Sequence, residues 1–118
     1  MSLDAKARRR YARQLLLAEI GEVGQERLIA SGFRGTADCE ADAYAVAADY
    51  LERAGCFGDD EGTEVRVPRA SEVMRFAGNA SLKEPAALVL GAYSAVEHLK
   101  RVLGIAPAHE VPTDLTLS

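Results

Sequence analysis

The stretch EADAYAVAADYLERAG, residues 40–55, contains the pattern that decides the fold. Four of its apolar residues recur at the i, i+3, i+4, i+7 spacing of one helix face: Tyr44, Ala47, Ala48 and Leu51. This spacing predicts an amphipathic helix over about residues 40–54. Gly55 is placed to end it, because glycine adopts the left-handed conformation of a helix C-cap at little cost. We expect Thr36 or Asp38 to cap its beginning.

The segments on either side of this helix indicate a small sheet. Residues 31–35 before it form either a loop or a very short strand. Residues 57–62 after it are rich in Gly and Asp and predict a turn. Residues 63–67 then alternate polar and apolar side chains and end at a proline, which predicts a strand. The fold class that follows is α/β, mostly helical, with a reduced sheet.

Three further helical segments are predicted. Residues 3–20 are helix-prone and place Tyr11, Leu15 and Ala18 on one apolar stripe. We expect Gly21 and Gly24 to break this helix before a second short turn over residues 25–30. Ser71 is a suitable cap for a short helix that reaches Ala77.

The strongest helix pattern covers residues 86–103. We expect its buried stripe to consist of Leu88, Ala92, Val96, Leu99 and Leu103. Small residues beside the stripe, such as Gly91 and Ala95, would allow another helix to approach closely. Lys100 and Arg101 lie in the last turn, where the helix dipole favours cations, and Gly104 is placed as the C-cap.

Length and composition indicate one domain over residues 1–118. We divide it into an N-terminal helical arm, residues 1–30, a reduced α/β body, residues 31–105, and a tail, residues 106–118, whose end is a weak candidate for an edge strand. Apolar residues are 48% and charged residues 27%, as in ordinary globular proteins. No apolar run reaches the ~20 residues of a membrane span, and the polar, basic N-terminus does not resemble a secretory signal. We expect a cytoplasmic protein without a membrane partner.

Charge is unevenly distributed along the chain. Residues 1–34 carry seven Lys or Arg and four Asp or Glu, whereas the rest carries seven and fourteen. The distribution indicates either contact between a basic arm and an acidic body, within one chain or between chains, or two separately solvated faces. It disfavours nucleic acid as a partner, because the phosphate backbone prefers a basic body.

The arm RYARQLLLAEIGEVGQERL, residues 10–28, resembles the opening arm of the ThiF/MoeB/HesA family. These ubiquitin-activating-like enzymes adenylate the C-terminus of a small sulfur-carrier protein. The family pattern is close to RYxRQ…GxxGQxxL, and this chain keeps all of it. A second match, AALVLGAYSAVEHLKRVLG over residues 86–104, is similar to the family's late helix, GAxxAxExxKxxLG.

The family's nucleotide loop is not kept. A GxGGxG turn lets backbone N–H groups approach the phosphates, but the corresponding place here reads FRGTADCE, residues 33–40, with one glycine and two acids, Asp38 and Glu40. The SNLxRQ block, the paired CxxC motifs for zinc and a recognisable catalytic-cysteine loop are also missing. The resemblance therefore implies a truncated, degenerate member: a Rossmann-like remnant whose helix over residues 40–54 persists while the loop has lost its chemistry.

For function, the resemblance implies a catalytically inactive accessory subunit or pseudoenzyme. It would bind a full-length ThiF-type adenylating enzyme, its ubiquitin-like sulfur carrier, or itself as a homodimer. In the family, the arginine of the RQ pair contacts ATP phosphates in the neighbouring protomer, which implies the same role in trans for Arg13, with Arg10 and Gln14 beside it. The alternatives are a small enzyme with altered ATP or AMP binding, and a helical dimer of unrelated role. For Arg13 the alternative is a solvated or ion-paired helix residue.

The remaining reactive side chains predict no cofactor or metal site. Cys39 and Cys56 are too far apart for a CxxC pair; two reduced thiols are expected, and one disulfide is the alternative. Cys39 lies among acids, which oppose thiolate formation. His98 and His109 lack a second ligand at useful spacing, and the acidic run from Asp59 to Glu61 is expected to face water.

Overall fold

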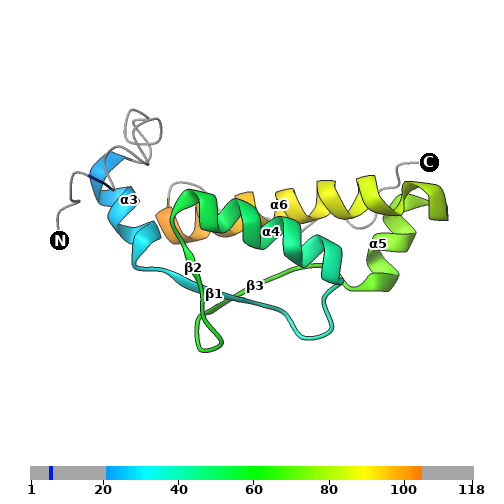
Figure 1. The fold of residues 1–118 in the computed structure, drawn as a ribbon, viewed down its shortest axis with the longest axis horizontal. Helices are drawn as coiled ribbons and strands as arrows, with labels where there is room; N and C mark the ends of the chain where they lie inside the picture. Colours follow the sequence, from blue (N-terminus) through cyan, green and yellow to red (C-terminus); the bar gives the residue numbers. More distant parts are fainter. Residues whose placement is uncertain (1–5, 7–20, 105–118) are drawn as a thin grey trace.

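The computed structural model describes Lys6 and residues 21–104. In this part the chain forms a mostly helical α/β fold with a three-stranded parallel sheet and a Rossmann-like topology. The order of elements is α3, β1, α4, β2, β3, α5, a short 3-10 helix and α6 (Figure 1). The fold class predicted from the sequence is confirmed. The predicted helix over residues 3–20 and the edge strand of the tail lie outside the described residues.

The sheet has β1 (Gly32–Gly35) at its centre, between β2 (Phe57–Gly58) and β3 (Thr63–Val65). All pairing is parallel, with Phe33 opposite both Gly58 and Thr63. The predicted strand at residue 63 is confirmed, and the segment left open as loop or strand is a strand. The prediction of a turn for residues 57–58 was wrong. Two residues are too short to show alternation, so only their pairing with β1 reveals β2.

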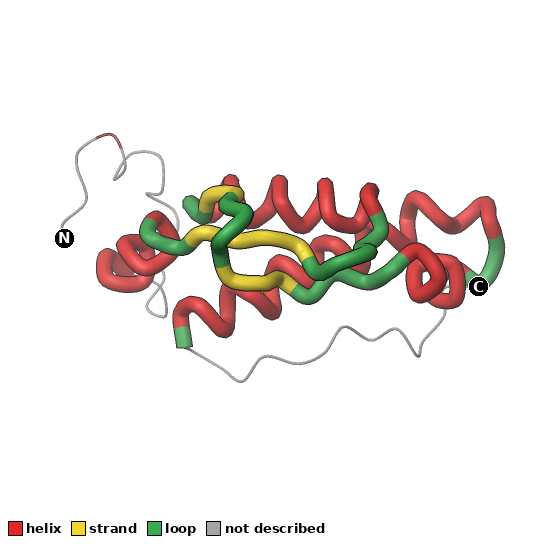
Figure 2. The backbone as a smooth tube through the Cα atoms, turned by 90° about the horizontal axis from the view of Figure 1, so that it is seen from below, coloured by secondary structure: helices red, strands yellow, loops and turns green. Residues whose placement is uncertain are grey.

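A four-residue loop, residues 59–62, connects the two edge strands by crossing over β1 on the outer face of the sheet (Figure 2). The Asp59 backbone N–H donates to the Phe33 carbonyl at 2.9 Å. Gly62 touches the β1 backbone so closely that an added Cβ would lie 2.5 Å from the Gly32 carbonyl carbon. Glycine at this position therefore allows a short loop to connect two parallel strands, a connection that a helix usually makes.

The described helices cover one face of the sheet only. Figure 2 shows the three strands in front, with α4 (Ala41–Ala54) and α6 (Lys83–Leu103) behind them. Phe33 and Val65 point into the core and are each 1% exposed. On the outer face Arg34 and Glu64, paired in register, form an ion pair at 3.1 Å between Nη1 and Oε2. This polar pair suits contact with water, although Phe57 of the edge strand β2 is 45% exposed.

The main packing contact joins α4 and α6, which lie side by side (Figure 1). At Gly91 an added Cβ would lie 2.5 Å from the Ala43 carbonyl oxygen and 2.8 Å from Val46 Cβ. The predicted close approach at the small residues of α6 is therefore confirmed. Of the predicted stripe of α4, Ala47 and Leu51 are buried in the core, while Tyr44 and Ala48 are partly buried against it.

The predicted buried stripe of α6 was wrong in its orientation. Leu88 and Val96 are 52% and 50% exposed, although Leu103 is buried as expected. The buried face consists instead mainly of Ala86, Ala87, Leu90, Gly91, Ser94, Ala95, Glu97 and His98. This face is rich in small residues because α4 lies so close to it. A periodicity argument that ranks large apolar side chains first selects the other face.

Helix starts also differ from the predictions. In α5 (Ala70–Ala77) the N-cap is Arg69, whose backbone N–H donates to the Glu72 carboxylate at 3.1 Å, so Ser71 lies inside the helix. In α3 (Gly21–Ile29) Gly24 does not break the helix and is buried within it. The predicted C-caps are confirmed: Gly55 and Gly104 both adopt left-handed conformations.

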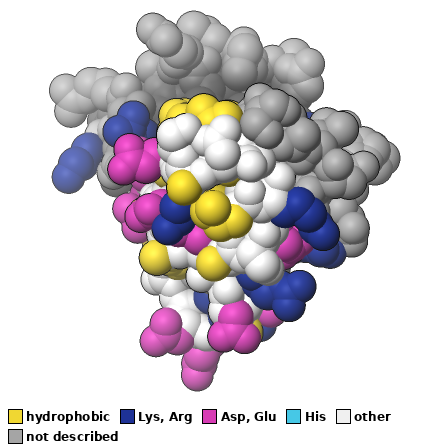
Figure 3. Space-filling view, turned by 90° about the vertical axis from the view of Figure 1, so that its right-hand side faces the viewer, with side chains coloured by type: hydrophobic (Ala, Val, Ile, Leu, Met, Phe, Trp, Pro, Cys, Tyr) yellow, Lys and Arg dark blue, Asp and Glu magenta, His cyan; other side chains and the backbone are white. Residues whose placement is uncertain are grey.

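At the end of the molecule that carries α5, hydrophobic side chains are exposed among acidic and basic ones (Figure 3). Among the described residues, none of the helices combines the length and the hydropathy that a bilayer crossing requires.

Candidate functional site

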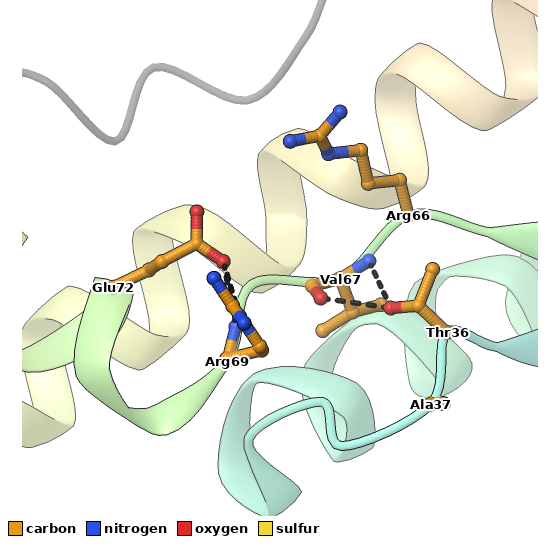
Figure 4. A pocket seen from close by; sticks show the side chains of 6 residues that line it. All are labelled: Thr36, Ala37, Arg66, Val67, Arg69 and Glu72. Carbon is orange, nitrogen blue, oxygen red and sulfur yellow. Dashed lines mark hydrogen bonds and ion pairs between the residues drawn. The ribbon is translucent and has the colours of Figure 1, made fainter.

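An open pocket of about 200 Å³ lies at the carboxyl ends of β1 and β3. Its lining consists of Thr36, Ala37, Arg66, Val67, Arg69 and Glu72 (Figure 4). The chain leaves β1 through α4 to reach β2 on one side, while β3 lies on the other side. The pocket therefore lies at a topological switch point, where ligands bind in open α/β sheets.

Thr36 forms the floor of this pocket by joining the segments that follow the two strands. Its Oγ1 donates to the Val67 carbonyl at 2.9 Å and accepts from the Val67 backbone N–H at 3.1 Å (Figure 4). The Thr36 N–H also donates to the Val65 carbonyl at 3.1 Å. These bonds extend the pairing of β1 and β3 beyond their ends, so the floor is rigid.

The charges around the pocket favour a small anion. Two arginines, Arg66 and Arg69, line it against one acid, Glu72. Arg69 Nε lies 3.5 Å from Glu72 Oε1, while the Arg66 side chain extends away from the Thr36–Val67 bonds (Figure 4). The sequence predictions did not include these residues. Polar side chains directly after two parallel strands were the signal that would have found them.

The place that corresponds to the glycine loop is filled by the chain's own side chains. Glu40 is the N-cap of α4, and its Oε2 accepts from the Ala43 backbone N–H at 2.6 Å while only 7% of the residue is exposed. The prediction that Thr36 or Asp38 caps this helix was wrong, because the cap is Glu40 and Asp38 lies before it in a turn, with φ 59°. A carboxylate thus already occupies one of the N–H groups with which a helix N-terminus binds phosphate.

Gly35 is equally closed to a ligand. A Cβ added there would lie 2.7 Å from Cδ1 of the Tyr44 ring and 3.1 Å from Cys39 Sγ. The glycine is needed because the tyrosine ring packs against it. The space that a phosphate would require for close backbone approach is therefore taken by an aromatic ring of α4.

The second half of the arm motif attaches α3 to the body. Gly24, Gln25 and Leu28 are buried. Gln25 Nε2 donates to the Ala54 carbonyl at 2.8 Å, and Arg27 Nη1 donates to the Leu103 carbonyl at 3.1 Å. The last carbonyls of α4 and α6 thus receive bonds from α3, which fixes its position. Arg10, Arg13 and Gln14, the predicted nucleotide contacts in trans, lie outside the described residues.

The two cysteines are free thiols in unreactive surroundings. Burial raises the pKa of Cys39, and the nearby carboxylates of Glu40 and Asp38 raise it further. Burial raises the pKa of Cys56 to about 11, against a lowering hydrogen bond from Ser31. Nucleophilic cysteines need a lowered pKa, so neither residue has the electrostatics of a catalytic thiol.

His98 is buried at 2% exposure, and neither ring nitrogen has a hydrogen-bond partner within the described part of the chain. Burial lowers the pKa of His98, and the charge of Arg101 lowers it further. No cluster of three His, Cys, Asp or Glu side chains suited to a metal ion occurs among residues 21–104. The residues from Asp59 to Glu61 are exposed, as predicted.

No protein-family model, curated protein or solved structure matches this chain.

Proposed function

We propose that the chain is a catalytically inactive, ThiF-like accessory subunit or pseudoenzyme of the cytoplasm. It binds a full-length ThiF-type adenylating enzyme, its ubiquitin-like sulfur carrier, or a second copy of itself. The observation that carries the proposal is the closed loop after β1, where the Glu40 carboxylate holds the first turn of α4 and the Tyr44 ring packs against Gly35. A triphosphate needs both places open, so self-sufficient adenylation is disfavoured.

The buried half of the arm motif supports the binding role. Gln25 and Arg27 tie α3 to the ends of α4 and α6, which fixes the second half of the arm motif on the body. An arm that starts from a rigid base is suited to reach a neighbouring protein. This role requires no chemistry in the body of the chain itself.

Co-purification tests the proposal. A tagged chain should retain a ThiF-type enzyme or a carrier protein with an adenylatable C-terminus, produced from the same genome. With an enzyme partner, Arg13→Ala should lower the partner's turnover by about 10²-fold or more, as for other lost transition-state cations. Arg8→Ala is the matched control and should leave turnover unchanged. Absence of both an enzyme and a carrier contradicts the accessory role, and equal effects of the two variants contradict the trans role of Arg13.

The pocket at the ends of β1 and β3 favours a second candidate, a small enzyme with altered ATP or AMP binding. Arg66 and Arg69 give it a positive balance, and it lies at the switch point of the sheet. Calorimetric titration with ATP, AMP and inorganic phosphate tests this candidate. Saturable binding that is weakened by Arg69→Ala supports this candidate. If the heats measured at millimolar nucleotide equal those of dilution into buffer, the candidate is contradicted.

A further inference from the structure

The outer face of α6 carries an exposed apolar stripe, and Leu99 at its end also packs against the core. Leu88, Val89 and Val96 are 52%, 45% and 50% exposed, and Ala92 and Leu99 are partly buried beside them. We call Val89, Ala92, Val96 and Leu99, flanked by Leu88, the α6 seam. It points away from α4, which packs on the opposite side of the helix at Gly91.

The spacing of the seam is that of a helix made to pair with another helix. Its four central residues alternate steps of three and four, which is the a and d pattern of a coiled coil. Glu97 is the only charged residue between Pro85 and Leu99, and it is buried at 6% exposure. A continuous apolar face without charges indicates an interaction site, since isolated exposed apolar residues would not follow a heptad.

We propose that the α6 seam is the interface of a homodimer, in which the α6 helices of two copies pack antiparallel. Side-chain size supports a second copy as the partner. In this arrangement Val89 lies level with Leu99 of the other copy, and the small Ala92 lies level with Val96. Every layer then pairs a smaller with a larger side chain, whereas a parallel pair would place Ala92 against Ala92 and leave a gap.

Charge selects the same orientation. The last turn of α6 carries Lys100 and Arg101, and its first turn carries Lys83 and Glu84. A parallel pair would bring the two basic last turns and their aligned helix dipoles together. In the register that sets Val89 level with Leu99, the antiparallel pair separates the two basic last turns by roughly 20 Å along the helix axes, at 1.5 Å per residue. Each basic last turn then lies level with Ala87 and Leu88 of the other copy, so no like charges face each other along the seam.

This inference rests on the proposed function in one respect only: of the three partners proposed above, it selects a second copy of the chain. It assigns that contact to a surface on the late helix, far along the chain from the arm. A seam of one helix pair is smaller than a standard interface, so we expect a dimer constant on the order of micromolar.

Sedimentation equilibrium of the full chain over a wide concentration range tests the inference. The wild-type chain should pass from monomer to dimer, and Val96→Glu should weaken dimerisation at least tenfold. Tyr50→Glu is the matched control, because Tyr50 is similarly exposed, at 46%, but lies on α4. Circular dichroism verifies that each variant is folded. If Val96→Glu does not fold, Val89→Glu replaces it, and a wild-type chain that stays monomeric overturns the inference without any variant.

Disulfide trapping tests the orientation. A mixture of Ala92→Cys and Val96→Cys chains should form a cross-linked heterodimer on mild oxidation, while Ala92→Cys alone should not. Cross-linking of Ala92→Cys with itself overturns the antiparallel arrangement. The proposed function can fail separately from this inference. A monomeric chain that still retains a ThiF-type enzyme contradicts the seam dimer but not the accessory role. A dimeric chain that retains neither such an enzyme nor a carrier contradicts the accessory role but not the seam dimer.

Discussion

Replacement of His98 by leucine is expected to stabilise the protein. The imidazole is 2% exposed, and within the described residues both of its nitrogens lack hydrogen-bond partners. An unsatisfied buried polar group costs about 1–3 kcal/mol, while a hydrophobic replacement of similar volume costs less than about 1.5 kcal/mol in packing. We therefore expect His98→Leu to raise the free energy of unfolding by about 1–2 kcal/mol near neutral pH.

The stabilisation by His98→Leu should be larger at acidic pH. Burial lowers the pKa of His98 in the folded chain, so below the ordinary value of 6.5 the unfolded chain binds more protons than the folded one. The stability of the wild-type chain is thus fully present above that value and falls as the pH drops towards the folded pKa, by at most about 1.4 kcal/mol per pH unit from this group. The variant lacks this loss.

Urea unfolding of both chains, followed by circular dichroism between about pH 5 and 8, measures the difference directly. Carboxylates and His109 contribute equally to both chains and cancel in the difference. The free-energy difference should be constant above pH 7 and increase below it. A difference that does not change with pH, or a variant that is less stable at every pH, refutes the reasoning that an unpartnered neutral imidazole is held in the core.

Three further predictions concern packing, capping and thiol reactivity. Gly91→Ala should lower the free energy of unfolding by about 1–3 kcal/mol despite alanine's better helix propensity, because the new Cβ would meet the α4 backbone at 2.5 Å. Thermal unfolding measures this loss. Gly58→Ala is the control, because a Cβ added at Gly58 would have no atom within 4 Å. Glu40→Ala should cost about 1 kcal/mol in urea unfolding through the lost bond to Ala43, and an unchanged stability would mean that the cap is dispensable. Cys56, with its pKa raised to about 11, should react with a disulfide reagent at neutral pH far more slowly in the folded chain than in denaturant, and equal rates would contradict its burial.

The helices of this protein were largely determined by local sequence. The period of residues 40–54 and the glycines at 55 and 104 specified α4 and both C-caps, because hydrophobic spacing and left-handed glycine conformations are properties of a few neighbouring residues. The strand at residue 63 was visible in its alternation for the same reason. The acids in the loop after β1 already predicted that the negative charge there would disfavour phosphate binding.

Contacts between distant segments decided the rest. β2 exists because Phe57 and Gly58 pair with β1, and nothing in those two residues specifies a strand. The buried face of α6 was set by how closely α4 approaches Gly91, so small residues turned inward and the larger Leu88 and Val96 turned outward. The pocket likewise joins Thr36 to Arg66 and Arg69, which only parallel pairing brings together. Periodicity identifies an apolar face, but only the neighbour that packs against the helix determines which of two faces is buried.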